Sequence, residues 1–307
     1  MLHYGMSLTG SSHIKRGIVC QDAHKIFQLS NGWIVAAVAD GVGSSRHSDI
    51  ASRLAVDTVI EMCNNRIDKH TKLSEVKEIV KKAYNEAQQR IVNYAYAHDD
   101  ELSDYDTTLH MVVYDGSGFV YGHAGDGGII GLTNDGKYIK VTKPQKAEDS
   151  ICVIPLRAGE DSWVIGEQKG KFASVLLATD GIYDTFYPYL LRDNYPDIYV
   201  PLARFFMDNN VLSVTQENIG EIEKSRLDFV NSEAYASVDD DKTLVVVINP
   251  NIFPKMQEDS YYTEPDWDRL QLEWNMKAYP HLYNDSSTTV APNDGSCDKR
   301  HKSDDVE

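Results

Sequence analysis

The chain has 307 residues, enough for one large domain with a substantial core or for two modest ones. Its 47 acidic side chains outnumber 30 basic ones, a formal charge of −17 that argues against a nucleic-acid partner and suits a protein that holds cations. The N-terminus lacks a secretion signal, and no apolar run reaches the roughly 18 residues that span a bilayer. The four cysteines form no C-x-x-C pair. We therefore predict a cytoplasmic protein that binds neither nucleic acid nor membrane.

The first predicted elements form a β-hairpin whose two arms carry an aspartate at the same end. A loop over Gly10–Ala23 leads into a strand over His24–Leu29. The turn Asn31-Gly32 then joins this strand to a buried strand over Trp33–Ala39. The last run is continuously apolar, as is typical of a strand covered on both faces. It stops at Asp40-Gly41, which alone could also be an ordinary hairpin turn. Because the arms are nearly equal in length, we expect Asp22 and Asp40 to lie close together.

Two consecutive amphipathic helices follow this hairpin. Apolar residues recur at helical spacing over Asp49–Cys63, with Ser48 as the expected N-cap. A second helical pattern follows Ser74 and continues to Ala95. Two helices after a hairpin, before more strands, favour helices layered on antiparallel sheets over alternating βαβ units.

From Thr107 onward, short apolar runs separated by glycine turns predict a meander of antiparallel strands. Within it, Gly125-Asp126-Gly127 interrupts the strands with a carboxylate, which is consistent with either a bulge or a ligand site. Residues 142–170 contain two prolines and many charges and carry no pattern of regular structure. We interpret them as a mobile insertion beside the site.

A second buried strand, Ser174–Gly181, repeats the pattern of the first and also ends in Asp-Gly. Prolines are expected to break the helical segment Tyr183–Met207 into shorter pieces. After a predicted helix over Ile219–Ala236, the acids of Asp239–Asp241 precede a buried strand over Thr243–Ile248. If that strand is antiparallel to its neighbours, its start meets their ends and the acids converge.

The sequence divides into a domain over residues 1–250 and a C-terminal extension over 251–307. The extension carries one helical pattern, over Trp267–Met276, and then an acidic end rich in Ser, Asp and Asn that is predicted to be disordered.

Carboxylates at five strand ends suggest a cation site. They are Asp22, Asp40, Asp126, Asp180 and one or more of Asp239–Asp241. Like charges packed together are unfavourable unless cations neutralise them, and hard oxygen ligands favour Mg²⁺ or Mn²⁺ over Zn²⁺. A pair of such ions roughly 3.5–4 Å apart could hold a bridging water or hydroxide for in-line attack on phosphorus.

These stretches resemble the motifs of the protein phosphatase 2C family, in the family's order and over about Gly5 to Asn249. The motifs are QDA at Gln21, VADGVGSS at Val38, TTL at Thr107, GHAGDGG at Gly122, LLATDGIYD at Leu176 and DDKTLVVV at Asp240. The resemblance implies an α+β fold, an αββα sandwich of two antiparallel sheets flanked by helix pairs. It also implies hydrolysis of phosphoserine and phosphothreonine with two Mn²⁺ or Mg²⁺ ions.

The resemblance also implies a set of metal ligands. Asp40 matches the family's bridging aspartate, and Gly41 matches the glycine that binds metal through its carbonyl. Asp180 and Asp240 match two later ligands. Asp22 matches an edge aspartate that acts through water, and Asp126 matches the acid of a third, weaker metal. Asp184 matches a recurrent acid to which no role is assigned. Of these residues, Asp40 and Asp180 are the predicted catalytic acids.

Several positions depart from the family pattern. The family's phosphate-binding arginine usually lies where this chain has Gly17, so Arg16, Lys15 and His13 all remain candidates, and Arg16 is preferred. Gln21 replaces a common glutamate. Val42 stands where many eukaryotic members have a histidine that is proposed as general acid, as is usual in bacterial-looking members. His47 or a metal-bound water could take that role, although a surface or capping role for His47 is favoured.

The favoured hypothesis is a monomeric bacterial phosphatase that acts on phosphorylated proteins of a cognate Ser/Thr kinase. In this reading residues 142–170 form the family's variable flap and select substrates. The alternative is a pseudophosphatase that binds phosphoproteins as a regulatory module, which the missing arginine and Gln21 favour. A purely structural sandwich would leave the strand-end acids unexplained.

Overall fold

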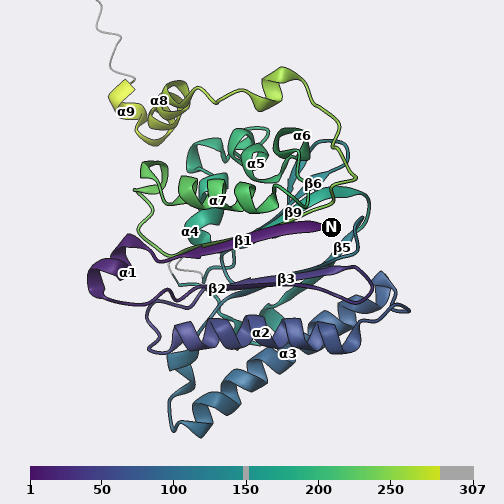
Figure 1. The fold of residues 1–307 in the computed structure, drawn as a ribbon. Coiled ribbons are helices and arrows are strands. Elements are labelled where there is room, and N and C mark those ends of the chain that lie inside the picture. Colours follow the sequence, from purple (N-terminus) through teal and green to yellow (C-terminus); the bar gives the residue numbers. More distant parts are fainter. Residues whose placement is uncertain (148–151, 284–307) are drawn as a thin grey trace, which may run out of the picture. The chain divides into compact units, whose positions relative to one another are not determined.

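Two antiparallel sheets stack face to face and are flanked on both sides by helices (Figure 1). The computed structural model describes residues 1–147 and 152–283. Contacts divide these residues into a first unit, Met1–Glu264, and a second unit that begins at Pro265. The α+β fold and its sandwich architecture are as the sequence predicts.

Each sheet has five strands. The first sheet has the order β2-β3-β4-β5-β8, with bounds Ala23–Gln28, Ile34–Ala39, Leu109–Tyr114, Phe119–Ala124 and Val164–Gln168. The second has the order β1-β10-β9-β6-β7, with bounds Leu2–Leu8, Lys242–Ile248, Phe172–Ala178, Gly128–Thr133 and Tyr138–Lys140.

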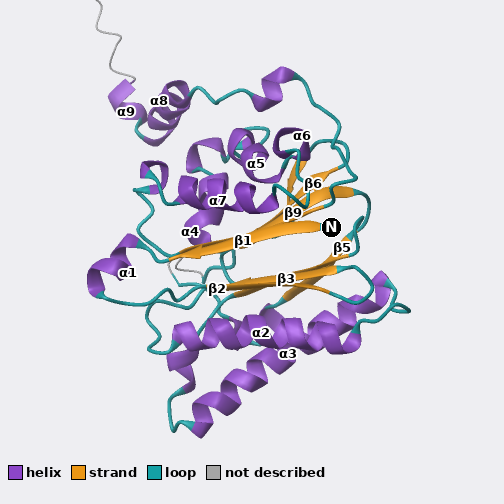
Figure 2. Cartoon of the chain, viewed as in Figure 1, coloured by secondary structure: helices purple, strands orange, loops and turns teal. Residues whose placement is uncertain are grey.

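Helices cover the outer face of each sheet (Figure 2). On the first sheet these are α2 and α3, at Ser48–Arg66 and Leu73–Ala97. On the second they are α4, α5, α6 and α7, at Asp180–Phe186, Val200–Met207, Asn209–Leu212 and Ile219–Val230. The predicted layering of helices on antiparallel sheets is confirmed.

Strand β3 shows why the central strands are apolar throughout. Val35, Ala37 and Ala39 pack toward α2 and α3. Ile34, Ala36 and Val38 pack between the two sheets. Every side chain of β3 is therefore buried, which a continuous apolar run requires and an alternating pattern would not provide.

The N-terminal part differs from the prediction in two ways. Strand β1, which the sequence analysis does not identify, pairs antiparallel with β10 in the register Gly5↔Val245. The predicted loop Gly10–Ala23 contains a short helix, α1, at Ser11–Arg16. This helix ends at Gly17, whose φ of 67° suits a residue without a β-carbon. The six-residue helix is too short for a periodic apolar pattern to reveal it.

The predicted meander after Thr107 is wrong in its connectivity. Strands β4 and β5 form a hairpin in the first sheet, but β6 and β7 belong to the second. Gly125-Asp126-Gly127 is therefore a crossing between sheets, and Gly125 turns the chain with a φ of 116°. Apolar periodicity marks a strand but does not specify which sheet it joins, so the sequence could not distinguish the two arrangements.

The described part of residues 142–170 contains regular structure that the sequence did not predict. Val164–Gln168 forms β8, which pairs with β5 at the edge of the first sheet. The side chains of β8 are exposed or half-buried, and an edge strand needs no strong apolar pattern. The sequence therefore gave no signal that predicts this strand. Positions 148–151 of the predicted flap lie outside the described residues.

Some helix ends also differ. Ser48 is the first residue of α2, and the capping position is His47, which makes no side-chain capping bond. The helix predicted over Ile219–Ala236 ends at Val230 and is followed by a single turn at Glu233–Tyr235. Asp180 and Gly181 open α4 rather than form a turn.

The first unit, Met1–Glu264, contains the predicted domain over residues 1–250 together with the segment that follows it. The Tyr261 hydroxyl accepts a hydrogen bond from the backbone N–H of Tyr138, which ties this segment to β7. The second unit contains α8 at Trp267–Ala278, the predicted helix, and α9 at Pro280–Tyr283. The predicted disordered end, from 284 onward, lies outside the described residues. Within the described ranges no helix has the length and apolarity to cross a membrane.

Candidate functional site

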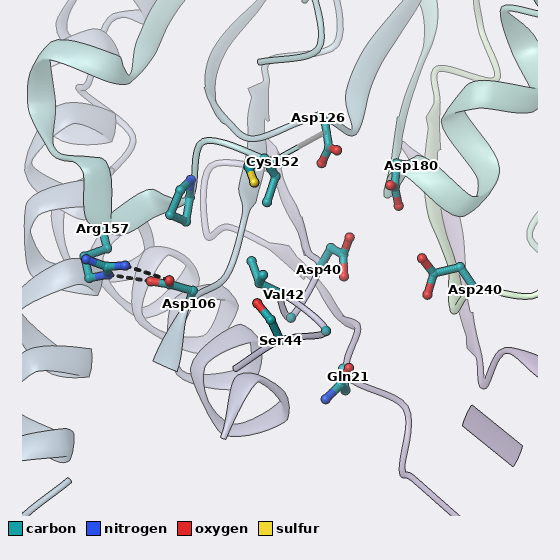
Figure 3. Close-up of a pocket in the computed structure, with 14 residues that line it drawn as sticks. Gln21, Asp40, Val42, Ser44, Asp106, Asp126, Cys152, Arg157, Asp180 and Asp240 are labelled. Atoms are coloured by element: carbon teal, nitrogen blue, oxygen red, sulfur yellow. Dashed lines mark hydrogen bonds and ion pairs between the residues drawn. The ribbon is translucent and has the colours of Figure 1, made fainter. Parts of the chain in front are cut away.

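Acidic side chains from both sheets meet in a cavity of about 500 Å³ (Figure 3). The carboxylates that line it come from strand ends that are distant in sequence. They are Asp40, Asp126, Asp180 and Asp240, joined by Asp106. The structure therefore brings together most of the predicted site acids, and we call this space the carboxylate cavity.

The β2–β3 hairpin brings Asp22 and Asp40 to one end, as predicted. Ala23 pairs with Ala39, so Asp22 and Asp40 come next on the two arms. The backbone of Asp40 is held by the two residues just before β4, because Thr108 N–H and Thr107 Oγ both donate to its carbonyl oxygen at 2.8 Å. Its own N–H donates to Thr108 Oγ at 2.9 Å. The position of Asp40 is thus set by the end of β3 and by the residues that lead into β4.

Antiparallel pairing also brings Asp180 and Asp240 together. Leu244 of β10 pairs with Ala178 of β9, so the acids before β10 meet the end of β9. Thr179 links the end of β9 to the β2–β3 hairpin, because its hydroxyl donates a hydrogen bond of 2.8 Å to Asp22 Oδ2. The sequence analysis missed this role, although a threonine between a buried strand and Asp180 was the available signal.

Asp126 reaches the cavity from the crossing between the sheets. One carboxylate oxygen from each of Asp40, Asp126 and Asp180 lies within 4.8 Å of the others. Asp126 is 6% exposed, and Lys146 Nζ lies 3.6 Å from its Oδ2. This spacing allows a single cation to contact more than one carboxylate.

The electrostatics of the cluster oppose full ionisation. Burial raises the pKa of Asp22 to about 7, although hydrogen bonds from Asp40 and Thr179 lower it. Burial, followed by the charges of Asp126 and Asp240, raises the pKa of Asp180 to about 6. Burial and the neighbouring charges of Asp22 and Asp180 hold the pKa of Asp40 well above its ordinary value. The protein itself supplies too little positive charge here to keep all these acids ionised.

The donor chemistry fits a hard divalent cation. The cluster offers carboxylate oxygens and no thiolate or imidazole, which favours Mg²⁺ or Mn²⁺. Buried Asp22 Oδ1 and Asp180 Oδ1 have no hydrogen-bond partner among the described residues, and neither has Gln21 Oε1. Unsatisfied buried oxygens of this kind are costly unless a cation or water binds them.

Gly41 allows a close approach of neighbouring backbone atoms beside Asp40. A β-carbon at this position would lie 2.7 Å from both the Gln21 carbonyl oxygen and the Ser48 carbonyl oxygen. Only glycine fits between these backbone atoms, so the chain can follow Asp40 into the cavity.

Asp241, the neighbour of Asp240, organises the backbone around the site. Its carboxylate accepts the N–H groups of Gly10 and Gln21 at 2.6 Å each. Its Oδ1 also lies 2.9 Å from Nδ1 of buried His13. Asp241 thereby ties the start of β10 to the segment that carries Asp22, while Asp240 lines the cavity.

Asp241→Ala is expected to destabilise the protein by about 3 kcal/mol, because two buried N–H groups lose their acceptor and buried His13 loses the carboxylate beside it. Urea unfolding checks this value, with Asp239→Ala as the matched control, since Asp239 is exposed. Equal destabilisation by the two substitutions would contradict this role for Asp241.

The structure does not bring the three predicted phosphate-binding candidates to the cavity lining. Arg16 is exposed on α1, and its Nε donates to the Ser12 carbonyl oxygen. Lys15 is also exposed, and His13 is engaged by Asp241. The position of α1 explains the difference, because the helix carries these side chains away from the strand ends.

Arg157 is the arginine that does line the cavity. Its Nε and Nη2 donate to the two carboxylate oxygens of Asp106 at 2.6 and 2.8 Å (Figure 3). Sequence reasoning missed Arg157 because it lies in residues 142–170, which carry no recognisable pattern.

The other candidates for proton transfer are placed differently. Val42 lines the cavity, whereas His47 does not. The His47 Nε2 lies 3.8 Å from Asp100 Oδ2, and its ring packs on Tyr105. Asp184 lies one helical turn after Asp180. Partial desolvation of its carboxyl, followed by the Asp180 charge, raises the pKa of that group.

Comparison with solved structures shows the same fold in bacterial phosphatases. The serine/threonine phosphatase Stp1 of Staphylococcus aureus is 13% identical, with 81% of this chain and 95% of that chain covered and a TM-score of 0.56. The S. agalactiae serine/threonine phosphatase is 16% identical, with 80% and 99% covered and a TM-score of 0.58. The catalytic domain of the serine/threonine phosphatase PstP, solved in complex with two manganese ions, is 17% identical, with 80% and 96% covered and a TM-score of 0.52.

Sequence comparison identifies the family. No curated protein matches the chain. The sequence model described as protein phosphatase 2C, however, matches residues 9–218, more than half of the chain. The chain therefore belongs to the protein phosphatase 2C family of metal-dependent protein phosphatases.

Proposed function

We propose that the protein is a catalytically active serine/threonine phosphatase that uses two Mn²⁺ or Mg²⁺ ions. The observation that carries this proposal is the convergence of carboxylate oxygens from Asp40, Asp126 and Asp180 within 4.8 Å of one another. When bound, two such ions polarise a phosphoryl group and acidify water, so hydrolysis needs no nucleophilic side chain.

The proposed ligands follow from the positions of the acids. Asp40 would hold both ions, with Gly41, Asp180 and Asp240 completing the pair. Asp22 would act from the edge through water, and Asp126 would hold a third, weaker ion. The anchoring of Asp40 by Thr107 and Thr108 supports this assignment, because ligands that are already held in place need little reorganisation when they bind.

The proposed substrates are phosphorylated proteins of a cognate kinase. Cys152, Val153, Pro155 and Arg157 line the carboxylate cavity, which supports a substrate-selecting role for the flap at 142–170. The proposed catalytic domain is residues 1–250, acting as a monomer. Cys20 and Cys63 are free thiols, which supports a reducing, cytoplasmic setting.

The alternative is a pseudophosphatase, favoured by the displaced Arg16 and by Gln21. Hydrolysis of an aryl phosphate and of a phosphothreonine peptide, with Mn²⁺ and with EDTA, distinguishes the two. We expect turnover of both substrates only with the metal. A folded protein that binds phosphopeptides but turns over neither substrate would establish the alternative.

Arg157 is proposed to bind the substrate phosphate in place of Arg16. Arg157→Ala is expected to raise KM for a phosphopeptide about tenfold and to leave kcat within about twofold, because a charge-assisted contact to the ground state is lost. Arg16→Ala is the matched control and should leave KM unchanged. If only the Arg16 substitution raised KM, the phosphate would bind near α1.

A further inference from the structure

A second cavity, of about 660 Å³, carries a charge opposite to that of the chain. Three cations line it, Lys140, Lys146 and Arg192, against two carboxylates, Asp184 and Asp197. The whole chain has a formal charge of −17. A local excess of positive charge in such a protein is a feature that selects for anions. We call this space the Lys140–Arg192 pocket.

The Lys140–Arg192 pocket is a neighbour of the carboxylate cavity. Lys146 lines the pocket while its Nζ lies 3.6 Å from Asp126 Oδ2 of the cavity. Asp180 lines the cavity, and Asp184 lines the pocket. Because these two residues are four positions apart on α4, they lie on the same face of that helix. Four residues span about 6 Å along a helix, close to the length of two residues of extended peptide.

Two of the three pocket cations, Lys140 and Lys146, are held by neighbouring side chains. The Lys140 ammonium lies 3.6 Å from the centre of the Tyr187 ring and 3.5 Å from Asp197 Oδ2. Both contacts orient it without removing it from the pocket lining. Arg192 is exposed, and no ion pair of its guanidinium is found in the described part of the chain. The pocket therefore retains at least one cation that can pair with an incoming anion.

We infer that the Lys140–Arg192 pocket binds an anionic side chain of the substrate, within about two residues of the phosphorylated residue. The inference rests on the proposed function, because the phosphorylated residue must occupy the carboxylate cavity. The shared chemistry is a carboxylate or a second phosphate on the peptide. The phosphatase would thus prefer acidic or multiply phosphorylated segments.

The test uses phosphothreonine peptides that carry Asp, phosphoserine, Ala or Lys two residues before or after the phosphothreonine. For the full chain we expect kcat/KM for an Asp or phosphoserine peptide to exceed that for the Lys peptide about tenfold. Separate Asp and phosphoserine peptides distinguish the two sources of negative charge. Equal kcat/KM across the series would overturn the inference.

Arg192→Glu is expected to reduce this preference to about twofold or less, because it inverts the charge that pairs with the peptide. Lys137→Glu is the matched control, since Lys137 is an exposed lysine between β6 and β7 and does not line the pocket. It should leave the preference intact. An equal effect of both variants would overturn the inference, because the peptide preference would then arise from the overall electrostatic potential of the protein and not from the pocket.

Two further measurements separate this inference from the proposed function. Hydrolysis of an aryl phosphate should be unchanged in Arg192→Glu, because that substrate has no flanking residue. Peptide affinity, measured by fluorescence anisotropy, should follow the same charge ranking. If turnover were absent but the affinity ranking held, the proposed function would fail and the pocket would stand. Affinities independent of peptide charge would overturn the pocket even in an active enzyme.

Discussion

Asp40→Asn and Asp180→Asn are each expected to lower kcat/KM for aryl phosphate hydrolysis by on the order of 10³-fold. Each substitution removes a charged oxygen donor from the centre of the cluster, where the proposed ions supply several kcal/mol of transition-state stabilisation. The assay compares both variants with the wild type over a range of Mn²⁺ concentrations. Asp135→Asn, an exposed acid in the β6–β7 turn, is the control and should retain full activity.

The same substitutions should have the opposite effect on folding. Burial and like charges raise the pKa of Asp40 well above its ordinary value, so an ionised Asp40 destabilises the metal-free protein. Replacing it with asparagine relieves that repulsion and should raise the Tm measured in EDTA. An Asp40→Asn variant that kept wild-type activity would contradict the metal-centre proposal. A lower Tm would instead show that the loss of activity arises from misfolding.

Without metal, the protein is expected to become less stable as the pH rises from about 4 to above 7. Burial raises the folded-state pKa of Asp22 to about 7 and that of Asp180 to about 6. In the unfolded chain both groups titrate near 3.9. Between these values the folded state holds protons that the unfolded state has released, so stability falls with pH. This contribution is fully present below about pH 4, is lost as the pH passes the folded-state pKa values, and amounts to several kcal/mol.

Divalent metal should reverse this trend. Binding requires ionised carboxylates, so the stabilisation by Mn²⁺ grows as the pH rises. Tm is measured between pH 5 and 8 in EDTA and in excess Mn²⁺, with Asp22→Asn as the variant in which the EDTA slope should flatten. Metal-free stability that rose with pH, or a slope unaffected by the Asp22 substitution, would contradict the assignment of these pKa values to the cluster.

Local patterns in the sequence were sufficient for much of the site. The apolar run that ends at Asp40 and the turn Asn31-Gly32 together predicted the hairpin that brings Asp22 beside Asp40. The second apolar strand predicted Asp180, and the acids before β10 converge on it as antiparallel pairing requires. These inferences succeeded because burial on both faces and tight turns leave direct marks on residue type.

Only the tertiary structure decided which partners meet across the chain. The sequence by itself determined the buried strands, the helices that cover them, the Asp-Gly ends and the family. It did not determine that β6 joins the second sheet, that Thr179 holds Asp22, or that Arg157 rather than Arg16 lines the cavity. The physical reason is that periodicity and turn signals report a residue's own burial and conformation. Contacts between distant segments depend instead on sheet order and on the direction in which each segment leaves its strand.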